Sequence, residues 1–144
     1  MRSKKAPLLA MVILFALTQT ALATEIAIIV NNNSPVTRLS VGEIADIYLG
    51  QKEVAGNVRL KPVDQSDKQE INAAFLEKIL HMTHDAYVSY WNRRLFQEGG
   101  IPPSLKGNSK EVISTVKEKE GAIGYVWASE LNAEGIRAIL TIDP

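Results

Sequence analysis

Residues 26–50 read IAIIVNNNSPVTRLSVGEIADIYLG, and they predict a strand, a polar turn and a helix in succession. The run from Ile26 to Val30 is wholly apolar and rich in β-branched residues, which is typical of a strand covered on both faces. Ser40 and Glu43 have the spacing of a capping box at the start of a helix. Apolar residues then repeat at helical spacing, as in a helix that lies on a sheet: Val41, Ile44, Ala45 and Tyr48.

The same alternation continues along the chain. Val58, Leu60 and Val63 fit a second strand, in which Pro62 removes one ladder donor and indicates the strand's end or a sheet edge. Capping residues and helical spacing predict three further helices: one that begins at the turn 64–67, one from Thr83 to about Phe96, and one from Asn108 or Ser109 to just before Gly121. Two further strands are predicted at residues 122–127 and 136–142. Alternating strands and helices predict an α/β domain with a mainly parallel sheet flanked by helices.

Composition limits the classes of protein that this chain can be. Without its first 23 residues the chain has 121, enough for one domain of ordinary size. These carry 13 basic and 16 acidic residues, a net charge of −3, which disfavours nucleic acid or an anionic membrane surface as a partner. There is no cysteine, which excludes disulfides, thiolate nucleophiles and Cys-ligated metals.

The first 23 residues have the pattern of an export signal. The chain starts with the basic residues Arg2, Lys4 and Lys5. An apolar run at residues 8–17 follows, and then a small-x-small motif at residues 21–23. The apolar run has 10 residues, whereas a membrane-spanning helix needs about 20. We therefore predict cleavage after Ala23 and a mature domain, residues 24–144, in the periplasm if the source is Gram-negative.

The turn from Asp64 to Lys68 is the strongest candidate for a binding site. Ligands of open α/β sheets bind at the carboxyl ends of strands, and a helix N-terminus favours an anion. Ser66 supplies a hydroxyl and Lys68 a cation. The alternative is an ordinary helix cap, in which the carboxylate of Asp67 occupies the same amides, and residue types alone favour it. Asp67 with Glu70, or Ser66 with Gln69, has the spacing of a capping box.

The turn from Asn31 to Ser34 is the second candidate, and we expect it at the same edge of the sheet. Asn32 and Ser34 complete the predicted ligand set with Ser66, Asp67 and Lys68. Such a segment suits either a ligand loop or a simple turn, because Asn tolerates left-handed conformations, and the simple turn is favoured.

No motif for catalysis or for a resident cofactor is found in the sequence. His81 and His84 are three residues apart, but no convergent carboxylate accompanies them, which favours a surface pair over a metal site. No Gly-x-Ser-x-Gly elbow occurs, and residues 121–124 lack the Lys-Ser/Thr of a phosphate loop. The sequence therefore predicts a protein that is not an enzyme and holds neither metal nor cofactor.

Four separated blocks resemble the phosphate-type periplasmic solute-binding proteins of ABC transporters. They are residues 39–50, LSVGEIADIYLG; Asp64-Gln65-Ser66-Asp67 leading to Phe75-Leu76; Tyr90-Trp91 with Phe96 and Pro102-Pro103; and residues 121–126, GAIGYV. The resemblance spans nearly the whole mature chain. It implies a type 2 periplasmic-binding fold, in which two α/β lobes close on an oxyanion, and this chain resembles only the second lobe with its flanking strands.

The sequence departs from the family pattern at the binding turn. Phosphate binders carry a Ser-Gly-Thr turn with an Arg shortly before it, whereas this chain has Ser66-Asp67-Lys68 and no Arg between Leu60 and Lys68. Ser66 alone carries over. Asp67 places a negative group where an anion would lie, which is unfavourable unless one partner is protonated.

Two hypotheses follow from the sequence. In the first, the protein is an exported single lobe that binds a small oxyanion such as phosphate near Ser66. In the second, it is an accessory or sensor domain whose former ligand face contacts another protein, such as a membrane transporter or receptor. A variant in which two chains face each other and rebuild a cleft is a further alternative.

Overall fold

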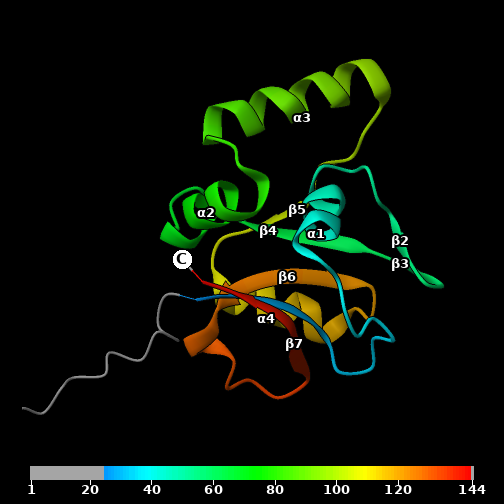
Figure 1. The fold of residues 1–144 in the computed structure, drawn as a ribbon, viewed down its shortest axis with the longest axis vertical. Helices are drawn as coiled ribbons and strands as arrows, with labels where there is room; N and C mark the ends of the chain where they lie inside the picture. Colours follow the sequence, from blue (N-terminus) through cyan, green and yellow to red (C-terminus); the bar gives the residue numbers. More distant parts are fainter. Residues whose placement is uncertain (1–24, 144) are drawn as a thin grey trace, which may run out of the picture.

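The computed structural model describes residues 25–143, so the predicted export segment and its cleavage site lie outside the described residues. A five-stranded sheet, in the order β5-β4-β6-β1-β7, forms the centre of the molecule (Figure 1). Its strands are β1 (Ile26–Asn31), β4 (Lys61–Gln65), β5 (Ser104–Lys106), β6 (Ala122–Trp127) and β7 (Ile136–Ile142). β4 is parallel to β5 and β6, and β1 is antiparallel to β6 and β7. Four strands thus run in one direction, which confirms the mainly parallel sheet, and β1 alone runs the other way.

Helices cover both faces of the sheet, as predicted. One face carries α1 (Val41–Tyr48) and α2 (Glu70–Phe75), which continues as the π-helical turn η2 (Leu76–Leu80). The other face carries α4 (Ser109–Glu118), whose Val112 and Val116 pack against β1. A hairpin of β2 (Val54–Ala55) and β3 (Val58–Arg59) leads from α1 to β4, and a 3₁₀ turn, η3 (Ala128–Glu130), leads from β6 to β7. Helix α3 (His84–Glu98) stands away from the sheet (Figure 1).

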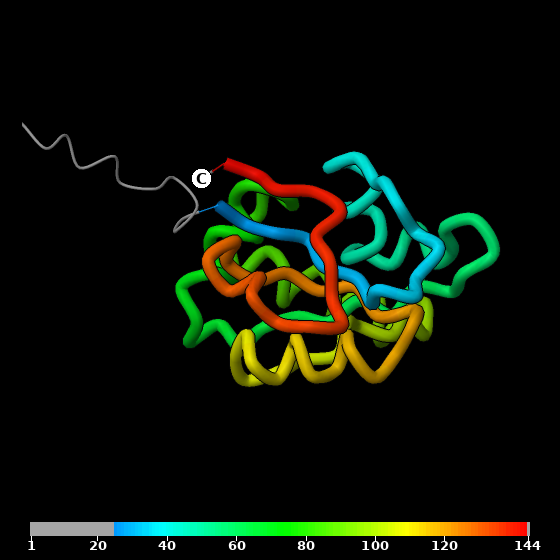
Figure 2. Tube along the Cα trace, turned by 90° about the horizontal axis from the view of Figure 1, so that it is seen from below, coloured from blue at the N-terminus to red at the C-terminus, as the bar shows by residue number. Residues whose placement is uncertain are grey.

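The first strand is buried on both faces, as its apolar run predicts. Ile26, Ile28 and Val30 belong to the core under α1 and α2, and Ala27 and Ile29 belong to the core under α4. Figure 2 shows β7, in red, running beside β1, in blue, so the two ends of the domain meet in the sheet. The first strand of the domain is therefore an interior strand.

An aromatic cluster joins α1 and α2 to the sheet. The ring of Phe75 stacks on that of Tyr125 with centroids 3.9 Å apart, and it meets Tyr48 edge-on at 4.6 Å. The Tyr48 hydroxyl lies 2.8 Å from the carbonyl oxygen of Val63 and 3.1 Å from that of Ile123. Because those carbonyls belong to β4 and β6, one buried side chain of α1 reaches two adjacent strands.

Several predicted helix starts are confirmed. Ser40 and Glu43 form both bonds of a capping box, and the side chains of Thr83 and Asn108 cap α3 and α4. The start of α2 was predicted wrongly, because Gln69 is its N-cap and makes no side-chain cap bond.

Helix α2 begins later than predicted because residues 66–69 form a turn of their own, closed by the Gln69 N–H, which donates to the carbonyl oxygen of Ser66 at 2.9 Å.

The interpretation of Pro62 as a strand end or edge was also wrong. It pairs with Ile123 of β6 near the start of an interior strand, one residue before pairing with β5 begins.

We predict that Gly124→Ala destabilises the domain. An added Cβ would lie 2.6 Å from Val112 Cγ1 and 3.4 Å from Val116 Cγ2, so α4 would have to move off β6. The expected loss in the free energy of unfolding is about 1–3 kcal/mol, measured by urea denaturation. Gly42→Ala on α1 is the matched control, since its nearest neighbour is Ser40 Oγ at 3.9 Å and Ala favours helix. Equal stabilities of the two variants would contradict this packing.

Candidate functional site

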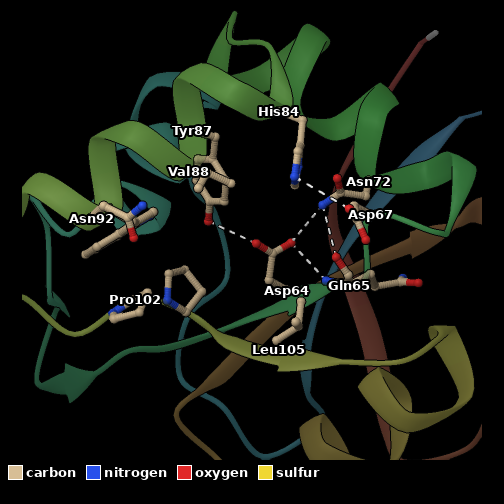
Figure 3. Close-up of a pocket in the computed structure, with 12 residues that line it drawn as sticks. Asp64, Gln65, Asp67, Asn72, His84, Tyr87, Val88, Asn92, Pro102 and Leu105 are labelled. Carbon is tan, nitrogen blue, oxygen red and sulfur yellow. Dashed lines mark hydrogen bonds and ion pairs between the residues drawn. The ribbon is translucent and has the colours of Figure 1, made fainter. Parts of the chain in front are cut away.

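A cavity of about 390 Å³ lies at the carboxyl end of β4, between this strand end, helix α3 and the loop that leads to β5 (Figure 3). This is the position that the α/β topology favours for a ligand. The cavity is lined by Asp64, Gln65, Asp67, Asn72, His84, Tyr87, Val88, Trp91, Asn92, Pro102, Pro103 and Leu105. Its walls come from segments that are far apart in the sequence and that meet only in the folded domain.

The carboxylate of Asp64, which is 5% exposed, is a buried charged group of the cavity wall. Its Oδ1 accepts hydrogen bonds from the Gln65 N–H at 2.8 Å, from Asn72 Nδ2 at 3.3 Å and from the Tyr125 hydroxyl. Its Oδ2 accepts from the Tyr87 hydroxyl at 2.9 Å (Figure 3). Four donors therefore face one carboxylate, an arrangement that favours its ionised form.

The titration of this network is governed by burial. Desolvation raises the pKa of Asp64 above its ordinary value, and hydrogen bonds from Tyr125 and Tyr87 oppose that rise. The pKa values of Tyr87 and Tyr125 are also raised, mainly by desolvation and next by the nearby charge of Asp64. The tyrosines are therefore neutral donors at physiological pH.

The rest of the cavity lining is largely apolar and contains one unpaired donor. Val88, Leu105 and the two prolines supply the apolar surface. Trp91 is 6% exposed, and its indole nitrogen lies near the Tyr87 hydroxyl but has no hydrogen-bond partner within residues 25–143. An unsatisfied buried donor costs about 1–3 kcal/mol, so an acceptor that reached it would be favoured.

The charge around the cavity is acidic. Asp64 and Asp67 line it, and no Lys or Arg is among the described residues that do so. His84 Nε2 lies 3.5 Å from Asp67 Oδ2 at the rim, where both side chains are about half exposed. A ligand that donates a hydrogen bond to a carboxylate suits this cavity better than a fully deprotonated anion.

The structure places Ser66, Asp67 and Lys68 together in the turn beside the cavity, with Asp67 in its lining. Asp67 does not cap α2, and its carboxylate lies toward His84 instead. Three of the four amides from Ser66 to Gln69 already donate within the protein: Ser66 N–H to the Lys106 carbonyl, Lys68 N–H to Ser66 Oγ and Gln69 N–H to the Ser66 carbonyl. The turn therefore offers an anion fewer amides than its sequence predicts.

Asn32 and Ser34 are not brought to this cavity. The expectation that both turns share one edge of the sheet was wrong, because β1 runs antiparallel to β6 while β4 runs parallel to it. Asn31 donates to the carbonyls of Val116 and Lys117 at the end of α4, and Ser34 Oγ accepts from the Val36 N–H. This segment is a turn at the opposite end of the sheet.

The sequence did not reveal the partners of Asp64. Asn72, Tyr87 and Tyr125 lie on α2, α3 and β6, between 8 and 61 residues away along the chain. One feature of the sequence indicated that Asp64 has such partners: it is an acidic residue directly after an apolar strand position. A carboxylate buried there needs hydrogen-bond donors around it.

The comparisons with known proteins concern the whole fold. No family model and no curated protein matches the chain. Among solved structures, it is similar to a protein described as a phosphate ABC transporter substrate-binding protein from Clostridium perfringens, solved with bound phosphate, with a TM-score of 0.65 and 22% identity over 82% of this chain. The chain shares the fold of the phosphate-binding proteins.

Two further structures agree with this result. An ABC-type phosphate transport receptor from Vibrio cholerae gives a TM-score of 0.65 at 18% identity, and PstS from Borrelia burgdorferi gives 0.59 at 15%. The three matches cover 81–82% of this chain but only 45–47% of those proteins. The predicted resemblance is confirmed at the level of fold, and this chain spans under half the length of the proteins it resembles.

Two observations concern other types of site. No helix in residues 25–143 is both long enough and apolar enough to cross a membrane. Within the same residues, no group of three or more His, Asp or Glu side chains is placed to hold a metal ion.

We predict that Tyr87→Phe raises the pKa of Asp64 further, because it removes a hydrogen bond that favours the ionised carboxylate. The pKa can be measured from the carboxyl ¹³C shift, with the signal assigned through Asp64→Asn. An unchanged or lower midpoint in Tyr87→Phe would contradict the role of this hydroxyl.

The same network predicts a pH dependence of stability. A carboxyl whose folded pKa lies above its unfolded value of about 3.9 contributes stability that is fully present below the unfolded pKa and is lost as pH rises through the folded pKa. We expect this decrease to extend to higher pH in Tyr87→Phe than in the wild type, as measured by urea unfolding at a series of pH values.

Proposed function

We propose that the protein is an exported binding protein that holds a small oxyanion in the Asp64 cavity, with phosphate as the leading candidate. The observation that carries this proposal is the buried carboxylate of Asp64 at the carboxyl end of β4, in a fold shared with phosphate-binding proteins. Export directed by the predicted segment 1–23 would place the domain in the periplasm if the source is Gram-negative. There it would act as a solute-binding component beside an ABC transporter, and not as an enzyme.

Asp64 determines which oxyanions can bind. Phosphate retains a proton at neutral pH and can donate it to Oδ2, the oxygen that accepts one protein hydrogen bond. Sulfate has no proton and would place an unrelieved negative charge beside the carboxylate. His84 and Asn92 line the cavity, and Ser66 and Lys68 lie beside it, so these side chains are the available donors to the remaining phosphate oxygens.

The affinity of a single lobe should be modest. Small-molecule sites usually bury about 70–90% of their ligand, whereas this cavity is bounded by one lobe only. A dissociation constant of the order of millimolar is therefore expected.

The proposal predicts heat of binding with phosphate and little or none with sulfate in titration calorimetry. Asp64→Asn should reduce phosphate affinity about tenfold or more, because the amide cannot accept in the same way, and Ser66→Ala should weaken it less. Asp46→Asn, an exposed position on α1, is the control and should bind as the wild type does. Equal affinity for sulfate, or no heat with any oxyanion, would reject the assignment.

A second function is favoured by two exposed apolar residues, one near the end of α3 and one in the loop before β5. Phe96 is 84% exposed and Ile101 is 86% exposed, which is unusual for side chains of this size. They support an accessory or sensor domain in the periplasm that contacts another protein. Absence of anion binding together with association through these residues would favour this function over solute binding.

A further inference from the structure

A second cavity, of about 290 Å³, lies beside the Asp64 cavity. Trp91, Pro102 and Pro103 line both cavities. The second cavity is bounded further by the end of α1, by residues 50–53 and by residues 59–62, where β4 begins. We call it the Lys61 cavity. It lies at the start of β4, whereas the first cavity lies at the carboxyl end of that strand.

The lining of the Lys61 cavity is basic. It contains Lys52, Arg59 and Lys61 against one carboxylate, that of Glu53. The Asp64 cavity has the opposite charge, since within residues 25–143 two aspartates and no Lys or Arg line it. Adjacent cavities of one domain therefore suit ligands of different charge.

The cations of the Lys61 cavity are available to a ligand. Arg59 Nη1 lies 3.3 Å from Glu53 Oε2, and Lys52 Nζ lies 3.7 Å from Glu43 Oε1. These four side chains are between 32% and 72% exposed, and ion pairs of this kind contribute little to stability, so an anion can compete for the cations. No carboxylate in the described part of the chain forms an ion pair with Lys61.

The buried part of the same lining is apolar. Ile47, Leu60 and Trp91 line the cavity and are 2%, 6% and 6% exposed. The six-membered ring of the Trp91 indole lies against Gly50, where an added Cβ would come within 2.8 Å of Trp91 Cη2. An apolar group that packed against these side chains would be removed from water, which is favourable.

The Lys61 cavity is larger than a bare oxyanion requires. A sulfate ion takes about 150 Å³ if each of its atoms occupies the volume that a water molecule has in the liquid. Roughly half of the cavity would then be left to solvent. A ligand that combines an anionic group with an apolar body uses both the charged and the apolar parts of the lining.

We propose that the Lys61 cavity binds a small organic anion, in which a sulfonate, sulfate ester or carboxylate is joined to an aromatic or aliphatic group. Lys52 and Lys61 attract the charged group, and the exposed hydroxyl of Ser104 is a further donor. The inference goes beyond the proposed function, because it concerns another cavity and a ligand that needs no proton. Both sites can be occupied independently.

The test is a titration with benzenesulfonate, followed by the backbone amide signals in ¹⁵N NMR spectra. Benzenesulfonate has no proton to donate, so the carboxylate of Asp64 disfavours it. The amides of residues 50–53, 59–61 and 104 should shift, with a dissociation constant of the order of millimolar. Benzyl alcohol, which has no charge, and sulfate, which has no ring, should each bind about tenfold more weakly.

The double variant Lys52→Gln, Lys61→Gln should raise the dissociation constant for benzenesulfonate about tenfold, because it removes two cations of the cavity. The matched control is Lys110→Gln, Lys119→Gln. It makes the same change in net charge at exposed positions on and just after α4, which covers the other face of the sheet. The control should bind as the wild type does, and circular dichroism can verify that both variants are folded.

Three results would overturn the inference: equal affinities for benzenesulfonate and benzyl alcohol, equal losses in the two double variants, or shifts confined to His84, Asn92 and Leu105 of the Asp64 cavity. Phosphate binding without benzenesulfonate binding would reject this inference alone. Benzenesulfonate binding without heat from phosphate would reject the proposed function alone.

Discussion

One buried carboxylate connects four elements of the domain. Asp64, on β4, accepts hydrogen bonds from its own strand, from Asn72 of α2, from Tyr87 of α3 and from Tyr125 of β6. A buried charge is tolerated only when such donors surround it, so the four elements must be in place together. Asp64 therefore helps to hold the outlying helix α3 to the body, and it also lines the cavity.

Local signals in the sequence predicted most of the elements. The apolar run of β1 and the capping residues Ser40, Thr83 and Asn108 act through near neighbours, and the structure confirms them. The direction of β1 could not be predicted in this way, because it is set by pairing with strands about a hundred residues later. Because β1 runs opposite to β4, Asn32 and Ser34 lie at the other end of the sheet from the turn at Ser66.

The sequence predicted where the candidate site lies, but not which groups form it. The rule that ligands bind at strand ends identified the turn after β4. It could not show that the Ser66 hydroxyl and carbonyl would accept from amides of the same turn, which depends on the local backbone path. Nor could it show that tyrosines from α3 and β6 would surround Asp64, because no spacing rule links residues in different elements.

The placement of β1 has a consequence for biogenesis. This strand comes first in the domain, yet it pairs with β6 and β7, which are formed by residues 122–142. Contacts between such distant parts of a chain form slowly, and the centre of the sheet cannot close before the last strands are available. During synthesis, the central sheet of this domain can therefore be completed only after residues 122–142 have been made.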